Sequence, residues 1–218
     1  MFGSDTISVL WVTRAGLIGV LFGIVGLSRL LLRDRQRYGA ILESTPLAAL
    51  DVLAYNACCY LAVGLPADPG AIATPKLLHL PVVVVGLRLI GCALLLGGVG
   101  LLLASVLRRK AIGGQDIREG LITTGIYRFC RHPIYLGIVL VATAIALIGA
   151  HVDGLICLPA VMLANLLQAR IEERYDVGVR FADDYARYRE TTWMFGPPWL
   201  WLALAGSLLL VLGIGALD

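Results

Sequence analysis

The octapeptide RFCRHPIY at residues 128–135 places a guanidinium, an imidazole and a phenol directly before a long apolar run. Proline disfavours helix at the residue before it and suits the first turn of the helix that follows. We therefore expect His132 at the N-cap of a helix that begins at Pro133. A helix N-terminus carries free N–H groups and a partial positive charge, and Arg131 adds a full charge beside it. This position is therefore suited to bind an anion.

A purely structural interpretation competes with this one. Arg131 would then follow the positive-inside rule, and His132 would only cap a helix. The context favours a functional role for the motif, because residues 119–137, EGLITTGIYRFCRHPIYLG, form a continuous loop with Gly120 and Gly125 as turn points.

A second polar segment follows at residues 168–198. On a helix, Arg170, Glu173 and Arg174 share one face. An acidic residue near a helix C-terminus opposes the helix dipole, so Glu173 needs an arginine or a ligand as its partner.

The same segment predicts an amphipathic helix at the membrane surface. Phe181, Tyr185 and Tyr188 recur at the spacing of one helix face, with charged residues on the opposite face. Packing alone explains Phe181.

The composition indicates an integral membrane protein. Of the 218 residues, 59% are hydrophobic and 15% are charged, whereas soluble domains carry about 25% charged residues. About 20 apolar residues are needed to cross a bilayer. The apolar runs predict an all-α, polytopic protein with about six transmembrane helices, at 8–31, 46–65, 78–107, 134–150, 154–169 and 198–217. The runs at 134–150 and 154–169 predict a helical hairpin.

Basic residues predict the orientation of these helices. Fifteen of the 18 Lys and Arg residues fall near the ends of the runs at 8–31, 78–107 and 154–169. We expect these segments, and the cofactor site, to be cytoplasmic, with both termini on the opposite side. Arg14, Asp51 and Arg88 lie within apolar runs, where charges are costly. We expect Asp51 to pair with one of the arginines, or these residues to line an acceptor pocket.

Two classes of partner are excluded by the sequence. No basic stripe interleaved with aromatic residues points to nucleic acid, and none of the five cysteines has metal-ligand spacing. We expect no metal.

The two polar segments resemble the isoprenylcysteine carboxyl methyltransferase family and its phospholipid-methyltransferase-like relatives. The resemblance is carried by LITTGIYRFCRHPIYLG at 121–137 and EERYDVGVRFADDYARYRETT at 172–192. It implies an integral membrane enzyme that uses S-adenosyl-L-methionine as its methyl donor. The cofactor-binding residues that it implies, by position, are Gln115, Leu121, Ile122, Tyr127, His132, Pro133, Ile134, Tyr135 and Glu173.

The family also places an arginine before the glutamate, facing the acceptor carboxylate. Arg170 is the nearest candidate, although it stands three residues before Glu173 where four are expected. Ala182 occupies a position where the family usually has glycine. We expect three regions: a three-helix transmembrane region at 1–107, a methyltransferase core at 108–198 and an additional C-terminal transmembrane helix at 199–218.

The resemblance implies methyl transfer to a lipophilic acceptor that enters from the bilayer, with membrane lipids as surroundings. A carboxylate acceptor is already ionised and needs a cation to hold it, for which Arg131 and Arg170 are candidates. An amine head group must lose a proton, and His132 is the candidate base. The sequence leaves carboxylate, amine and thiol acceptors open.

Two alternatives remain at this level. Membrane sterol and steroid reductases have a similar helical core and a related C-terminal motif, but they bind NADPH; this chain has no basic cluster dedicated to a 2′-phosphate. A non-catalytic membrane protein is the other alternative, although a scaffold would need neither Arg131-His132-Pro133 nor Glu173.

Overall fold

The computed structural model describes residues 4–42, 44–66, 80–109, 120–150, 152–198 and 201. Within these residues every regular element is helical, which confirms the all-α prediction. The α-helices are α1 (Ser4–Arg33), α2 (Arg35–Leu42), α3 (Thr45–Gly64), α4 (Pro81–Arg109), α5 (Pro133–Gly149), α6 (Val152–Glu172) and α7 (Gly178–Thr191). A short 3₁₀ helix, η3 (Gly125–Arg128), precedes α5, and one π-helical turn, η4 (Glu173–Val177), joins α6 to α7.

Four of the described helical stretches are long and apolar enough to cross a membrane. They are Val9–Arg33, Pro46–Gly64, Pro81–Arg108 and Val152–Thr191, and the apolar part of the last corresponds to α6. The helix Pro133–Gly149 is shorter, and the run at 198–217 lies almost wholly outside the described residues. The long apolar helices therefore confirm the multi-pass class, whereas the number six and the orientation stay predictions.

The outer faces of these helices are apolar. Only 17% of the most apolar window of α1, and 17% of that of α4, is buried. Val82, Leu96 and Leu107 are 76%, 77% and 75% exposed, respectively. Apolar surface of this extent is unfavourable in water and is expected where helices face lipid.

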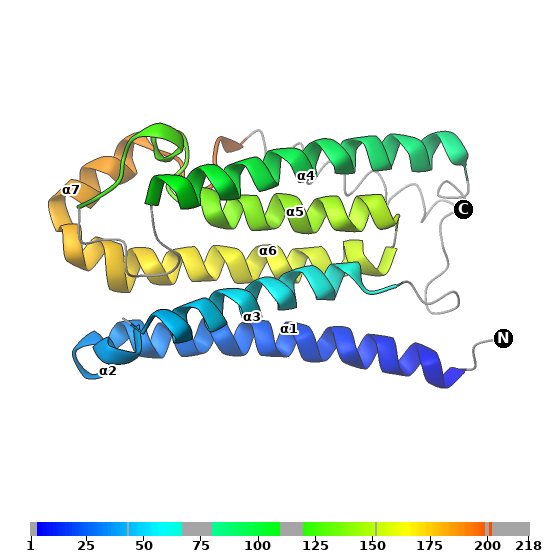
Figure 1. Cartoon of the computed structure of the whole chain (residues 1–218), viewed down its shortest axis with the longest axis horizontal. Helices are drawn as coiled ribbons and strands as arrows, with labels where there is room; N and C mark the ends of the chain where they lie inside the picture. Colours follow the sequence, from blue (N-terminus) through cyan, green and yellow to red (C-terminus); the bar gives the residue numbers. More distant parts are fainter. Residues whose placement is uncertain are drawn as a thin grey trace.

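The bundle is held together by close helix contacts. In Figure 1, α1 and α3 lie together, α6 lies in the middle, and α4 packs along α5. A Cβ added at Gly98 would lie 3.0 Å from the Gly137 carbonyl oxygen, and one at Gly137 would lie 3.0 Å from that of Gly98. Small residues that let two backbones approach are typical of membrane helix pairs. This contact crosses the predicted region boundary at residue 107, and the division into regions stays a prediction.

The polar segments gather at one end of the bundle. The C-terminal ends of α1, α4 and α6 lie there, together with α2, α7 and the loop before α5 (Figure 1). These are the segments that carry most of the basic residues, so the predicted clustering on one face is reproduced by the fold.

The predicted pairing of the charges in apolar runs is wrong. Arg14 pairs with Asp153 at the start of α6, and it donates to the Leu65 and Pro66 carbonyls. Arg88 donates to the Ile148 carbonyl. Asp51 instead lines a cavity, which agrees with the alternative of a pocket. The partners of Arg14 and Arg88 come from segments that are distant in the sequence. Hydropathy along the chain does not reveal such partners.

Candidate active site

A cavity of about 710 Å³ opens at the polar end of the bundle. Residues from α1, α2, α3, α4, α5, α6, η4 and α7 line it, together with the loop before α5. Pockets of roughly 300–1,000 Å³ are typical of small-molecule and cofactor sites. The cavity is therefore large enough to be a ligand site, and the two polar sequence motifs meet in its wall.

The start of α5 agrees with the sequence prediction. His132 is the N-cap and Pro133 is the first helical residue. The segment before the helix is fixed from outside, because the Arg131 and His132 backbone N–H groups donate to the Trp193 and Met194 carbonyls over 2.9 and 3.0 Å. The chain that follows α7 thus holds the motif in place.

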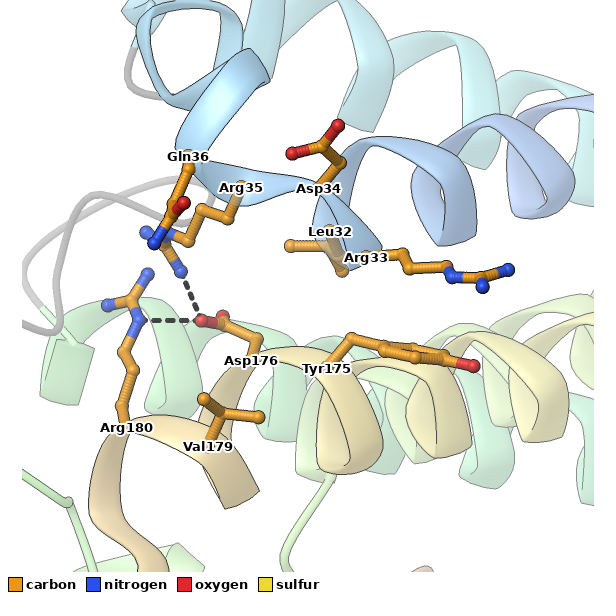
Figure 2. Close-up of a pocket in the computed structure, with 9 residues that line it drawn as sticks. All are labelled: Leu32, Arg33, Asp34, Arg35, Gln36, Tyr175, Asp176, Val179 and Arg180. Carbon is orange, nitrogen blue, oxygen red and sulfur yellow. Dashed lines mark hydrogen bonds and ion pairs between the residues drawn. The ribbon is translucent and has the colours of Figure 1, made fainter.

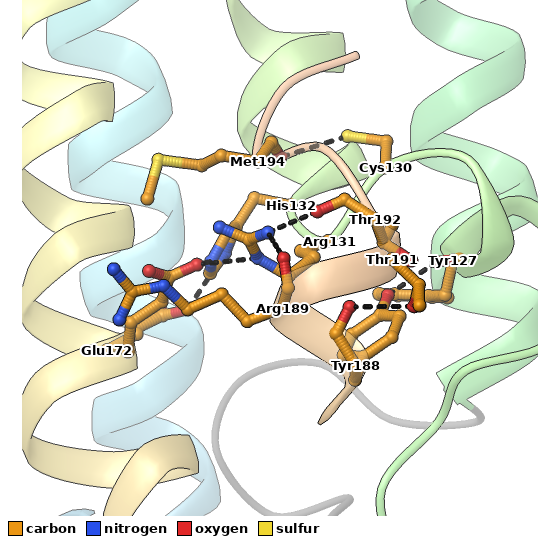
Figure 3. Close-up of polar contacts among 11 residues, drawn as sticks. Tyr127, Cys130, Arg131, His132, Glu172, Tyr188, Arg189, Thr191, Thr192 and Met194 are labelled. Carbon is orange, nitrogen blue, oxygen red and sulfur yellow. Dashed lines mark hydrogen bonds and ion pairs between the residues drawn. The ribbon is translucent and has the colours of Figure 1, made fainter. Parts of the chain in front are cut away.

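Cys130 also contacts the segment that follows α7. Its thiol donates to the Met194 carbonyl over 3.2 Å (Figure 3). Burial raises the pKa of the Cys130 thiol to about 11, so the thiol is neutral near pH 7. A neutral thiol is a hydrogen-bond donor rather than a nucleophile, and Cys130 is therefore a structural residue.

Arg131, His132 and Glu173 form the centre of the polar cluster. The Arg131 Nε donates to Glu173 Oε1 over 2.9 Å, and the His132 Nε2 lies 3.1 Å from the same oxygen. The side chains of Arg131 and Glu173 are only 8% and 11% exposed. Two donors on one carboxylate oxygen favour its ionised form.

A second nitrogen of the Arg131 guanidinium is also engaged. Its Nη1 donates to the Arg189 carbonyl over 3.0 Å and to the Thr192 carbonyl (Figure 3). Arg131 therefore links the start of α5 to Glu173 and to the end of α7. Because its guanidinium donates to three protein acceptors, Arg131 has a structural role in the site.

Glu172 forms a second carboxylate contact beside the first. It accepts a hydrogen bond from the Tyr135 hydroxyl, and its Oε2 lies 3.8 Å from the His132 Nδ1. The imidazole of His132 therefore lies between two carboxylates.

The π-helical turn η4 explains why two consecutive glutamates serve one site. In a regular α-helix consecutive side chains point about 100° apart. The turn begins at Glu173 and ends against Gly178, whose N–H bonds to the Glu173 carbonyl. A Cβ added at Gly178 would lie 2.3 Å from that oxygen, so the turn requires glycine there. Single π-turns within helices often mark functional sites.

Helix α7 closes the outer side of the site. Tyr185 and Tyr188 are buried, and the Tyr188 hydroxyl donates to the Tyr127 carbonyl. Phe181 lines the cavity, so the predicted aromatic stripe faces the protein. Ala182 has φ 34° and ψ −105°, a kink within α7. Left-handed backbone favours glycine, which gives a physical reason for the glycine that the resemblance implies at this position.

The cavity wall contains buried polar atoms without a protein partner. They include the Tyr55 hydroxyl and the Gln168 side-chain oxygen, and both residues line the cavity and are less than 9% exposed. An unpaired buried polar group costs about 1–3 kcal/mol. These atoms are suited to bind a polar ligand in the cavity.

Most of the predicted site residues line this cavity. They are Leu121, Ile122, Tyr127, Arg131, His132, Pro133, Ile134 and Tyr135. Glu173 lies behind them, bound to Arg131 and His132. Arg170 is exposed and is not among the lining residues, and Gln115 lies outside the described residues.

The sequence did not single out three of the lining residues as members of the site. Tyr55 comes from α3, and Gln168 and Glu172 come from α6. A weak signal existed for Glu172, which is adjacent to the predicted Glu173, whereas Tyr55 and Gln168 give no signal in the sequence. Asp51 on α3 lines the cavity, in agreement with one of its two expected roles.

Fold and site together define a helical membrane protein with an open cavity, bordered by charged and polar side chains, at one end of its bundle. Residues 87–177 match the family model of phospholipid methyltransferases. This match confirms the resemblance for that segment of the chain. No curated protein and no solved structure matches the chain.

Proposed function

We propose that the protein transfers a methyl group from S-adenosyl-L-methionine to the head group of a membrane lipid, at an amine nitrogen. The observation that supports this proposal most strongly is the cavity. It joins the two motif segments, carries unpartnered polar atoms of Tyr55 and Gln168, and is bordered by carboxylates.

The rim of the cavity supports a lipid acceptor. Leu27, Leu47 and Leu50 line the cavity and are about half exposed on the outer surface of α1 and α3. Apolar residues that face both a cavity and the lipid-facing surface allow an acyl chain to remain in the bilayer while a polar head enters. A lateral entry of this kind fits an acceptor that never leaves the membrane.

The charges favour an amine over a carboxylate. The Arg131 guanidinium is bound to Glu173 and two carbonyls, and Arg170 is exposed away from the cavity lining. Of the two cations predicted to hold an acceptor carboxylate, Arg131 is thus largely bound within the protein and Arg170 lies away from the cavity. Asp51 and Glu172 line the cavity instead, and two carboxylates attract an ammonium group.

The proposed chemistry needs little from the protein beyond orientation and one base. S-adenosylmethionine, when bound, supplies an electrophilic methyl group on a sulfonium. Asp51 and Glu172 hold the acceptor nitrogen, and His132, set between Glu172 and Glu173, takes its proton. The nitrogen lone pair then forms the bond to carbon while the carbon–sulfur bond breaks with its electron pair on sulfur. The buried wall excludes water and fixes the line of approach.

The first experiment is a calorimetric titration of the detergent-purified protein with S-adenosylmethionine, with NADPH as competitor. We expect saturable binding of S-adenosylmethionine that NADPH does not displace. Binding of NADPH alone would assign the protein to the reductases, and binding of neither would favour a non-catalytic protein.

The second experiment distinguishes a nitrogen acceptor from a carboxylate acceptor. Radiolabelled methyl groups are transferred to a membrane lipid extract, and the product is treated with base. Label on nitrogen resists base, whereas label in a methyl ester is released as volatile methanol, an outcome that would contradict the amine assignment. Asp51→Asn should lose transfer, and Asp184→Asn, at an exposed site on α7, should not.

A further inference from the structure

A second charged group lies between the main cavity and a smaller one of about 290 Å³. Arg35, Asp176 and Arg180 line both cavities. Arg35 begins α2, Asp176 lies in η4, and Arg180 lies in the first turn of α7. Segments distant in the sequence therefore converge on a charged group at the edge of the main cavity, and the proposed methyl-transfer step gives this group no role.

Asp176 holds the two guanidinium groups together. Its Oδ1 accepts a hydrogen bond from Arg35 Nη1 and forms an ion pair with Arg180 Nε at 2.6 Å (Figure 2). The Asp176 side chain is 9% exposed, and those of Arg35 and Arg180 are 30% and 24% exposed. One carboxylate thus offsets the repulsion between two neighbouring cations.

The group retains both charge and donors after this pairing. Two guanidiniums and one carboxylate leave a net charge of +1. Each guanidinium carries five N–H donors, and the Arg180 Nη2 is buried with no protein acceptor. Figure 2 shows the Gln36 side chain extending toward the same space. Paired arginines with spare donors in a fixed geometry are suited to bind phosphate.

We propose that Arg35 and Arg180 form a phosphate-binding site beside the cavity, which holds the phosphate of the lipid acceptor while its head group enters. This inference rests on the proposed function for the identity of the ligand. Asp176 acts as a positioning residue, because it fixes the spacing of the two guanidiniums. The site would select lipids that carry a phosphate over neutral lipids of the same chain length.

The test uses short-chain probes with the full-length protein in a nonionic detergent. Dihexanoyl glycerophosphate, dihexanoylglycerol and inorganic phosphate are titrated separately by calorimetry. We expect the wild type to bind dihexanoyl glycerophosphate more tightly than dihexanoylglycerol. Arg180→Gln and Arg35→Gln should each weaken the binding of the glycerophosphate about tenfold or more, as for one hydrogen bond between charged groups.

Control variants separate binding from folding. Arg187→Gln removes an arginine that is 77% exposed on α7 and should leave all three titrations unchanged. Arg180→Lys keeps the charge and loses the planar fork, so it should give an intermediate affinity even if Arg180→Gln folds poorly. Equal affinity of the wild type, Arg180→Lys and the two Gln variants for the glycerophosphate would overturn the proposal.

The remaining outcomes assign the source of the phosphate. Binding of inorganic phosphate alone, lost in Arg180→Gln, would support the anion site and assign it to a soluble phosphate. Titration with S-adenosylmethionine runs in parallel. Arginine-dependent lipid binding without cofactor binding would refute the proposed function and leave the phosphate site standing, whereas cofactor binding with arginine-independent lipid binding would refute the phosphate site alone.

Discussion

The two ends of the helical bundle each contain a buried arginine paired with a carboxylate, but the pairs differ in their surroundings. Arg14 and Asp153 are 0% and 3% exposed, lie 3.5 Å apart, and line neither cavity. Arg131 and Glu173 lie 2.9 Å apart next to a 710 Å³ cavity, and His132 shares the same oxygen.

The comparison teaches that a buried ion pair is not by itself a sign of function. Desolvation makes such a pair costly, and removing one partner leaves an uncompensated charge in either location. What distinguishes the polar end is the adjacent cavity with a histidine between two carboxylates. The Arg14–Asp153 pair joins α1 to α6. The Arg131–Glu173 pair instead positions side chains that border the cavity.

The largest expected effect is on stability at the end remote from the cavity. Asp153→Asn leaves the Arg14 charge without a counter-ion in the bundle interior, and we expect a loss of about 3–5 kcal/mol in the free energy of unfolding. Unfolding by dodecyl sulfate in mixed micelles measures it. The affinity for S-adenosylmethionine of the folded fraction should stay at the wild-type value. A stable variant with impaired binding would reverse the roles of the two ends.

The matching change at the cavity is Glu173→Gln. It keeps an acceptor for Arg131 but removes the charge that holds His132 and Arg131. We expect the affinity for S-adenosylmethionine to fall by about 1.5–3 kcal/mol, the range for a hydrogen bond to a charged group. Calorimetry measures this change, and unchanged affinity would remove Glu173 from the site. The loss of stability should be smaller than for Asp153→Asn.

The π-turn is tested by Gly178→Ala. The added methyl group would meet the Glu173 carbonyl at 2.3 Å, so the turn must shift. We expect a loss of about 1–3 kcal/mol in the free energy of unfolding, as for overpacking in a tight site, together with lower methyl transfer. Gly86→Ala on α4 is the control, because nothing lies within 4 Å of its added Cβ. Equal behaviour of the two variants would show that the turn tolerates a side chain.

The smallest expected effect is a gain. Ala182 has a positive φ of 34°, and a non-glycine residue in such a conformation stores about 1–3 kcal/mol. Glycine relieves this strain and costs about 0.5–1 kcal/mol in chain entropy. We therefore expect Ala182→Gly to raise the free energy of unfolding by about 1 kcal/mol, measured as a higher melting temperature. A lower melting temperature would mean that the kink carries no strain.

The start of the site could be predicted from the sequence because its causes are local. Proline at 133 fixes the beginning of α5 and sets His132 at the N-cap, and apolar runs of sufficient length predict the helices of the bundle. The resemblance supplied Glu173, which the structure places against Arg131 and His132.

The remaining features depend on distant contacts. Asp153 was not recognised as the partner of Arg14 because the two residues are brought together only when α1 packs on α6. Glu172 was missed because an α-helix directs neighbouring side chains apart, and η4 departs from that geometry. Tyr55 and Gln168 look like ordinary residues of apolar helices, and only the cavity between α3 and α6 shows their position.

The pairing of residues 130–132 with the segment after α7 has a consequence for biosynthesis. Arg131 leaves the ribosome 42 residues before Glu173 and 61 residues before Thr192, the residues whose oxygens receive its donors. During synthesis α5 is therefore complete while its N-terminal guanidinium still lacks its protein acceptors. The polar contacts of Arg131 are therefore completed only after helices α1 to α6 have been made, when the chain has reached Thr192.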